Sequence, residues 1–182
     1  HLKMKSTIIL LALMLAFSSA FAQKGKVTSA QTLKEAGKID EAFTTIEQTV
    51  DPSNPKAEKT IPWAKTWAVR GEIFQAIGQS TDESIKKLSD DPLTEALNSY
   101  KKALELDTKG NNEKSVKIKL TLLTNDLTNQ AINAFQVENY DLALSSFEQI
   151  LEVNDMPIVK ADSPDAVDTV IIFNAGLAAY NS

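Results

Sequence analysis

A short helical pattern recurs along this chain and limits what the chain can fold into. A small alanine is followed four residues later by an isoleucine or an aromatic residue, at Ala42 and Ile46, Ala96 and Tyr100, and Ala143 and Phe147. Residues four apart lie on one face of a helix, so each copy predicts a helix that a second helix can approach closely. No segment shows the sustained period-2 alternation of a strand. The sequence therefore predicts an all-α fold of helical hairpins.

A partner helix is expected before each of these helices. The segment from Trp67 to Phe74 precedes the second copy, and it resembles the W-x2-L-G-x2-Y pattern of a tetratricopeptide repeat, with Arg70 replacing Leu and Phe74 replacing Tyr. The second helix of that repeat is matched by Ala96, Tyr100, Ala103, Leu104 and Leu106. Leu127, Ala131 and Ala134 hold the equivalent places before the third copy, and a helix over about 24–36 should precede the first.

Residues Phe173 to Tyr180 resemble the beginning of a fourth repeat. The resemblance as a whole implies antiparallel, tetratricopeptide-like helix hairpins that form a right-handed superhelix over residues 23–182, truncated within that fourth repeat. The apolar face of its helix, expected at Val170, Ile171, Ala175, Ala178 and Ala179, would then lack half of its cover. We therefore expect further repeats to follow.

The spacing departs from a regular array, which repeats every 34 residues or so. The recurring alanines are at positions 42, 96 and 143, and extra residues fall at about 51–62, 79–91, 108–113 and 154–163. The apolar steps from Val116 to Phe135 predict one long helix over about 113–137. Asp91-Pro92 and Ser163-Pro164 are typical helix starts, and Gly78 is expected at a turn.

The first 22 residues have the features of a secretory signal peptide. Lys3 and Lys5 precede ten apolar residues, Ile8 to Phe17, and small residues then lead to a cleavage site after Ala22. The apolar run is too short for a membrane span, which needs about 20 residues. Met4 is the expected initiator, with His1 to Lys3 upstream of it. We expect an exported protein, periplasmic or secreted, without a lipid anchor because no cysteine follows the run.

Composition argues against an enzyme. The chain has no cysteine and one histidine, and that histidine is residue 1, so the mature chain should contain neither. Two Ser-x-x-Lys spacings, at Ser53 and Ser84, lack the accompanying motifs of serine enzymes. We therefore expect no catalytic residues, no cofactor and no metal site.

Charge argues against two classes of partner. Removal of Lys3 and Lys5 lowers the formal net charge from −5 to −7, and Arg70 is the single arginine. Such a chain lacks the basic surface that binds nucleic acid or anionic lipid. The partner is therefore expected to be a protein or peptide, and no stable membrane anchor is expected.

The family resemblance also implies where a partner would bind, because tetratricopeptide arrays generally receive a protein segment in a groove lined by their first helices. The groove positions that match in this chain are Glu72, Gln75, Asn125, Thr128, Phe135, Gln136 and Phe173. This lining lacks a Lys and Arg cluster, so an internal segment or a protein surface is expected rather than a free carboxylate. The predicted function is an exported, non-catalytic adaptor or scaffold in a bacterial envelope.

The alternative is a module that binds a glycan or another small ligand through Trp63, Phe135 and neighbouring amides. Trp67 holds a packing position in the resemblance and is expected in the core, whereas Trp63 either covers a hairpin edge or stacks on a ligand. Arg70 is expected in an intramolecular ion pair, with a peptide-carboxylate clamp as the alternative. The sequence does not decide the oligomeric state.

Overall fold

The computed structural model describes residues 23–162 and 167–182. The predicted signal peptide (1–22) and the predicted helix start at Ser163-Pro164 lie outside these residues. The described residues form helices joined by turns and contain no strand, which confirms the all-α prediction.

The helices follow the predicted order. The chain is helical over residues 23–35, and the longer elements after it are α2 (Ile39–Glu47), α3 (Ala64–Gln79), α5 (Pro92–Leu106), α6 (Glu113–Gln136), α7 (Tyr140–Asp155) and α9 (Thr169–Asn181). The bounds of α6 confirm the single long helix expected over about 113–137, and the segment contains no Gly or Pro to interrupt it. Three short elements fall in the predicted inserts: η1 (Pro55–Lys59), α4 (Glu83–Lys86) and α8 (Pro157–Lys160).

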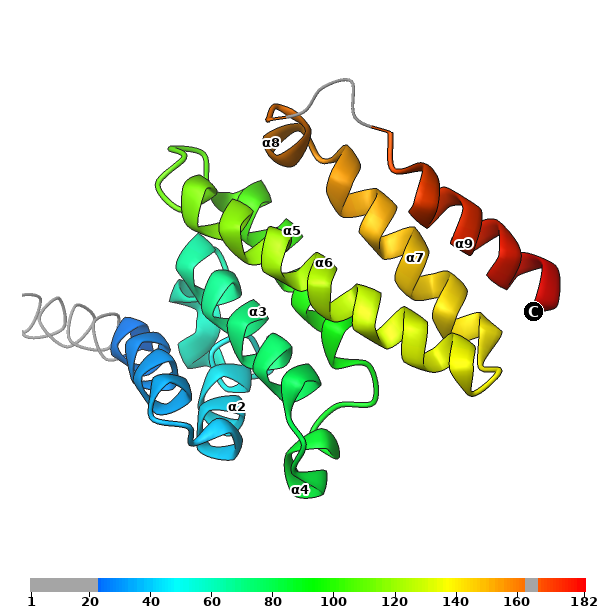
Figure 1. The fold of residues 1–182 in the computed structure, drawn as a ribbon. Helices are drawn as coiled ribbons and strands as arrows, with labels where there is room; N and C mark the ends of the chain where they lie inside the picture. The colour runs from blue at the N-terminus through cyan, green and yellow to red at the C-terminus, as the bar shows by residue number, and fades with distance from the viewer. Residues whose placement is uncertain (1–22, 163–166) are drawn as a thin grey trace, which may run out of the picture.

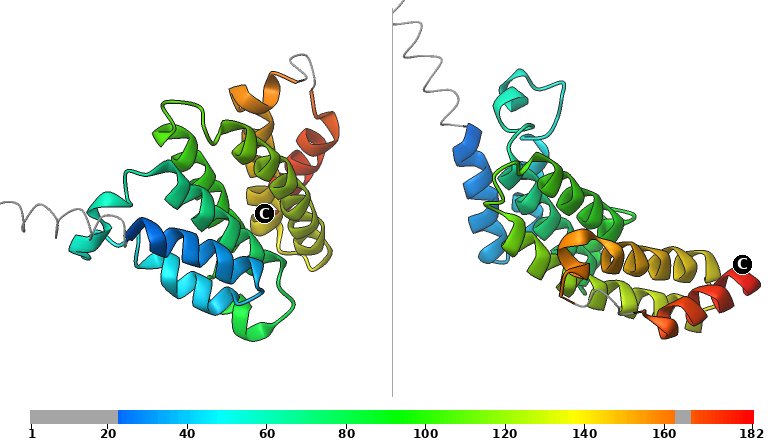
Figure 2. Two further views of the ribbon diagram at one scale, coloured as in Figure 1. Left: turned by 90° about the vertical axis from the view of Figure 1, so that its left-hand side faces the viewer. Right: turned by 90° about the horizontal axis from the view of Figure 1, so that it is seen from above.

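Neighbouring helices pack in pairs along the chain (Figure 1). The most extensive helix packing is between α3 and α5 and between α6 and α7. In addition, α2 packs on α3, α5 on α6, and α7 on α9. α3 also touches α6 directly. Seen from above, α6 and α9 lie in one layer and α5 and α7 in the other (Figure 2).

The core is formed by the recurring pattern from which the fold was predicted. Ala42, Ala96 and Ala143 are completely buried. The larger residues four positions later are buried as well, with Ile46 and Tyr100 fully covered and Phe147 3% exposed. Burying one such large side chain contributes roughly 1.5–3 kcal/mol, and the alanines let the helix backbones come close enough to bury it. Trp67 packs against this core, as expected.

Two helices end at a residue in the left-handed conformation. Gly37 (φ 77°) follows helix 23–35, and the N–H of Lys38 then donates to the carbonyl of Leu33. Glu138 (φ 61°) follows α6 in the same way, and the N–H of Asn139 donates to the carbonyl of Ala134 at 2.8 Å. Both ends satisfy carbonyls that the helix leaves without a partner.

Two local predictions need correction. Pro92 is the first residue of α5 as expected, but the side chain of Asp91 makes no capping hydrogen bond. The backbone ψ is similar at Asp91 (67°) and at Asp168 (76°), which does cap α9, so the backbone permits the bond and the rotamer of the Asp91 side chain does not make it. Gly78 does not form a turn: it lies inside α3, where Leu93 comes so close that a Cβ would have no room.

Candidate functional site

The exposed side of α6 carries a row of apolar and amide side chains. Residues three and four apart share a helix face, and every third or fourth residue from 118 to 136 is exposed. The members are Ile118, Leu122, Asn125, Asn129, Ile132 and Gln136. Ile118 is 55% exposed and Leu122 is 53% exposed, which is unusual for large aliphatic side chains on one side of one helix.

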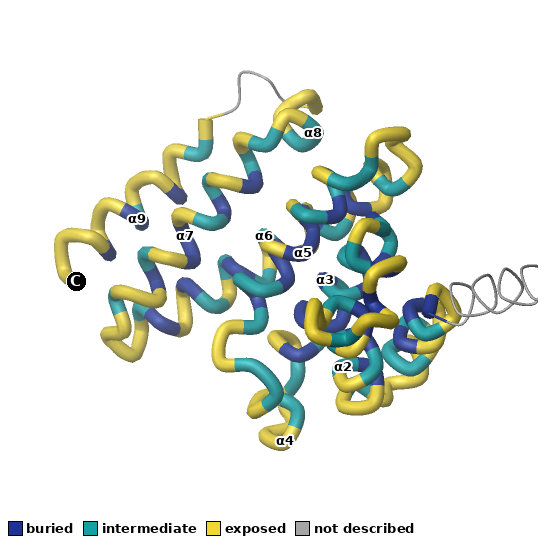
Figure 3. Tube along the Cα trace, turned by 180° about the vertical axis from the view of Figure 1, so that it is seen from behind, coloured by how far each residue is buried: buried dark blue, intermediate teal, exposed yellow. Residues whose placement is uncertain are grey.

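α9 adds a second set of exposed apolar side chains. Its buried residues are Ile171, Ala175 and Ala178, which lie on the side toward α7 (Figure 3). Val170, Phe173, Leu177 and Tyr180 are exposed instead. Of the five residues expected on the half-covered apolar face of α9, α7 covers Ile171, Ala175 and Ala178, whereas Val170 and Ala179 are exposed.

The two exposed sets meet at the end of α6. Ile132, Phe135 and Gln136 of α6 line a small cavity of about 180 Å³ together with Asn174 and Leu177 of α9, and Phe147 of α7 completes it. Phe135 is held in place by an edge-to-face contact with Tyr140, with ring centroids 5.1 Å apart. The α6 row together with Val170, Phe173 and Leu177 of α9 is called the α6–α9 face below.

The α6–α9 face is electrically neutral. None of its members carries a charge, and α9 has no charged residue between Thr169 and Asn181. Of the charged side chains beside it, Lys119 of α6 pairs with Glu72 of α3 and Lys117 with Asp162, while the Asp126 carboxylate accepts hydrogen bonds from Gln75 and Gln79. Apolar contact and amide hydrogen bonds are therefore the interactions that this face can offer.

Gln75 belongs to an internal network instead of an open groove. Its side-chain amide donates to Oδ2 of Asp126 at 2.6 Å, and its carbonyl oxygen accepts from the Tyr100 hydroxyl at 2.8 Å. Gln75 is 7% exposed and both ends of its amide are occupied. Burial raises the pKa of Tyr100 far above its usual value, and the nearby carboxylates of Glu72 and Asp126 raise it further. Gln75 thus links α3, α5 and α6.

Glu72 is also occupied by neighbouring helices. One carboxylate oxygen pairs with Lys34 of helix 23–35, and the other pairs with Nζ of Lys119 at 3.0 Å. The side chain is 11% exposed. Glu72 therefore holds three helices together.

The other predicted groove residues lie in different environments. Asn125 and Gln136 are exposed in the α6 row, and Phe173 is exposed on α9. Thr128 is half-buried at the edge of the row and donates to the Thr124 carbonyl one turn earlier. The structure thus gathers Phe135 and Gln136 at one cavity and exposes Asn125 on α6 and Phe173 on α9, whereas Glu72 and Gln75 hold the helices together.

The two tryptophans and Arg70 lie away from this face. The Trp67 indole N–H donates to the carbonyl of Ile61 at 2.7 Å, and Lys24 lies over the ring of Trp63. Arg70 pairs with Glu47 and Glu95, which confirms the intramolecular ion pair. Trp63 does not line the cavity beside Phe135, so the pair of aromatic residues suggested for a glycan is not gathered there.

Only some members of the α6 row were predicted from the sequence. Ile118, Leu122 and Asn129 were not singled out, because the stronger stripe from Val116 to Phe135 defined the helix. The signal that could have identified them is a second row on the opposite side of α6, at positions that buried residues do not occupy. Its members follow one another at steps of four, three, four and three: Ile118, Leu122, Asn125, Asn129 and Ile132.

Within residues 23–162 and 167–182, no group of three or more His, Cys, Asp or Glu side chains is placed to hold a metal ion. No helix in that part of the chain combines the length and the apolar character that crossing a bilayer requires. Comparison with known proteins finds no matching family model, curated protein or solved structure.

Proposed function

We propose that this chain is an exported, non-catalytic, tetratricopeptide-like adaptor that binds a protein partner through the α6–α9 face. The observation that carries the proposal is the row of exposed aliphatic and amide side chains along α6, continued by Val170, Phe173 and Leu177 of α9. Exposed apolar side chains gathered on one face are typical of a protein-binding surface.

The packing order supports the tetratricopeptide-like part of the proposal. Helix pairs α3/α5 and α6/α7 have the contacts of two hairpins, and the direct contact of α3 with α6 joins their first helices. α9 follows α7 in the same way that α6 follows α5. A stack of hairpins of this kind presents its first helices on one surface, where partners of repeat proteins bind.

The character of the face supports a protein partner over a small ligand. The cavity between α6 and α9, about 180 Å³, is below the 300 Å³ or so at which drug-sized ligands begin to fit. The row on α6 instead extends from Ile118 to Gln136, the length of a helix that a partner segment could lie along. Asn125, Asn129 and Gln136 can pair with the backbone or side chains of that segment.

Export to a bacterial envelope rests on the sequence of residues 1–22. The charged start, short apolar run and small-residue exit favour cleavage after Ala22. A partner in the same compartment follows from this part of the proposal.

Capture of partners by point variants tests the proposal. The purified chain is immobilised and used to capture proteins from an envelope extract. Leu122→Glu and Ile132→Glu each place a charge in the middle of the α6–α9 face, so these variants should no longer capture a partner that binds there. Val137→Glu is the matched control, because Val137 is 74% exposed just beyond α6 and outside the row. Circular dichroism of all three variants checks that the helices persist.

The two outcomes separate clearly. The proposal expects a protein that is captured by the wild type and by Val137→Glu, and lost with both row variants. A partner that all four chains capture equally would show that the α6–α9 face is not the binding site.

A further inference from the structure

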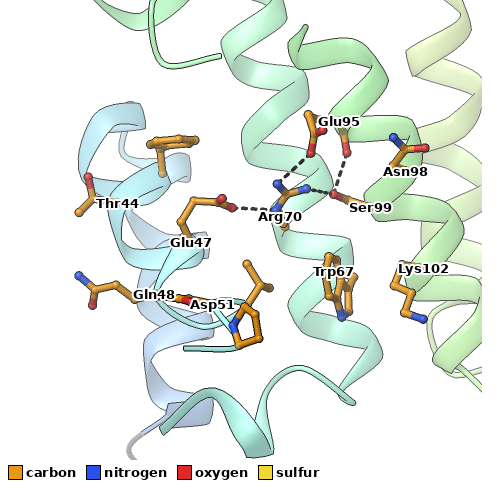
Figure 4. A pocket seen from close by; sticks show the side chains of 13 residues that line it. Thr44, Glu47, Gln48, Asp51, Trp67, Arg70, Glu95, Asn98, Ser99 and Lys102 are labelled. Carbon is orange, nitrogen blue, oxygen red and sulfur yellow. Dashed lines mark hydrogen bonds and ion pairs between the residues drawn. The ribbon is translucent and has the colours of Figure 1, made fainter. Parts of the chain in front are cut away.

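A larger opening lies between α2 and α5. Neither of these helices contributes to the α6–α9 face. The opening is a cleft of about 890 Å³, and the residues that line it come from one side of α2, the segment after α2, one side of α5, and Trp67 and Arg70 of α3 (Figure 4). The cleft has room for a peptide segment of several residues.

Arg70 is held by groups from both sides of the cleft. Its Nε donates to Oε1 of Glu47 at 2.7 Å, and its Nη1 donates to the Ser99 hydroxyl at 2.7 Å. Nη2 pairs with Oε2 of Glu95 at 2.9 Å, and the arginine side chain is 12% exposed (Figure 4). One guanidinium is thus matched by two carboxylates, which leaves this cluster with a net negative charge.

The rest of the lining brings one more carboxylate and one more basic group, so the net negative charge of the cleft is unchanged. Asp51 also lines the cleft, and hydrogen bonds from the hydroxyl and backbone N–H of Ser53 lower its pKa, which keeps the carboxylate charged at neutral pH. Lys102, the other basic residue of the lining, pairs with Glu105, which does not line the cleft. Three carboxylates therefore face the cleft against two basic groups.

Each of the three carboxylates has an oxygen that the hydrogen bonds above do not use. These oxygens are Oε2 of Glu47, Oε1 of Glu95 and Oδ2 of Asp51. Acceptors of this kind, on two walls of one cleft, suit a ligand that brings several donors and a positive charge.

Aromatic and aliphatic side chains form the remaining walls. Phe43, Val50, Pro52 and Trp67 line the cleft. The Trp67 N–H is already bonded to Ile61, so its ring offers an apolar surface. The guanidinium of Arg70 lies 4.2 Å from the ring centroid of Phe74 and 5.9 Å from that of Trp67, an arrangement in which a planar cation stacks on aromatic rings.

We propose that this cleft binds an arginine side chain carried by a segment of a partner polypeptide. The aliphatic stem of that arginine packs on Trp67 and Pro52, and its guanidinium donates to the carboxylate oxygens of Glu47, Glu95 and Asp51. Arginine suits the cleft better than lysine because a planar, five-donor head can bridge several carboxylates and stack on an aromatic ring. The site is independent of the α6–α9 face.

A matched pair of peptides tests this inference. The probe is acetyl-Gly-Arg-Leu-Arg-Gly-amide, and the control peptide carries citrulline, an uncharged isostere, in place of both arginines. Binding is followed by NMR through the indole N–H of Trp67, which the Trp63→Phe variant identifies. We expect the arginine peptide to shift this resonance saturably and the citrulline peptide to leave it unchanged.

Variants of the chain sharpen the test. Asp51→Asn removes one charge without touching the Arg70 cluster, and we expect roughly two- to fivefold weaker binding, the size of an exposed ion pair. Glu148→Gln removes a charge from the exposed side of α7 and should leave binding unchanged. Asn98→Trp at the exposed side of α5 fills the cleft and should abolish binding.

Three results would overturn the inference. They are the absence of a saturable shift at Trp67 with the arginine peptide, equal binding of the citrulline peptide, and equal effects of Asp51→Asn and Glu148→Gln. None of these results bears on the α6–α9 face, because neither the probe nor the variants involve its residues.

Discussion

Gly71 of α3 lies directly against the ring of Tyr100 of α5, so closely that a Cβ on Gly71 would be 2.5 Å from Cε1 of Tyr100. Tyr100 is completely buried, and its hydroxyl is fixed by Gln75 one turn further along α3. The ring therefore has no free direction in which to move. This contact sets how closely α3 and α5, the most extensively packed pair of helices, can approach each other.

Substitution of this glycine should therefore destabilise the fold. We expect Gly71→Ala to lower the free energy of unfolding by about 1–3 kcal/mol, the usual cost of forcing extra volume into a packed core. Gly176→Ala is the matched control, because Gly176 is also helical and no atom lies within 4 Å of its added Cβ. Alanine should stabilise there by up to about 1 kcal/mol. Urea unfolding measures both, and equal effects would contradict the close approach.

The buried hydroxyl of Tyr100 predicts a pH dependence. At pH 7 we expect Tyr100→Phe to lower the free energy of unfolding by about 1–2 kcal/mol, because Gln75 loses its hydrogen-bond donor. The folded-state pKa of Tyr100 is raised, so the stability that its protonated form contributes is complete below the unfolded pKa of 10.0 and is lost as the pH rises above it.

Tyr100→Phe has no such group to ionise, so its deficit should shrink as the pH increases beyond about 10. Urea unfolding at pH 7, 9 and 11 measures the difference between the two chains. Tyr180→Phe serves as the control, because Tyr180 is 88% exposed. A deficit for Tyr100→Phe that stays constant over this range would show that the buried hydroxyl does not govern the dependence.

The end of α6 predicts a stabilising change. Glu138 adopts the left-handed conformation that glycine adopts at no steric cost, so Glu138→Gly should raise the free energy of unfolding by roughly 1 kcal/mol. Gly37 is in the same conformation at the end of helix 23–35, and Gly37→Ala should lower it by a similar amount. Thermal unfolding of the two variants should show shifts of opposite sign. Shifts of the same sign would contradict the shared conformation.

The predicted signal peptide implies where the mature chain begins. Protein recovered from the envelope of producing cells should begin at Gln23, as determined by N-terminal sequencing. Ala22→Lys puts a charged residue in the position before the cleavage site and should leave the leader attached. Recovery of a cytoplasmic chain beginning at Met4 would contradict export.

The helices could be predicted because their signal is local. Ala42, Ala96 and Ala143 each have their partner residue four positions later, and these residues are buried as expected. The roles of Gln75 and Glu72 could not be predicted in the same way, because their partners are remote in the chain: Asp126 is 51 residues from Gln75, and Lys34 is 38 residues from Glu72. Both residues match groove positions of the family resemblance, but only the packed structure shows that neighbouring helices already occupy them.

The candidate face was predictable to a similar degree. Asn125, Phe135, Gln136 and Phe173 were singled out from the family resemblance, and all four lie on α6 or α9 at exposed or half-buried positions. The aliphatic members Ile118 and Leu122 belong to a second row on α6, but which of the two rows is buried depends on which side of α6 meets α5 and α7. The cleft between α2 and α5 depends on the segment after α2, which has no helical period to interpret.

Site-specific photo-crosslinking tests the central claim, that the α6–α9 face binds a protein partner, most directly. A photoreactive phenylalanine analogue replaces Leu122, Ile132 or Phe173 in turn, and Glu148 on the exposed side of α7 serves as the control position. Illumination of cells that produce these chains should yield one and the same crosslinked partner from the three face positions and none from position 148. Crosslinks to that partner from position 148, with none from the face, would contradict the account.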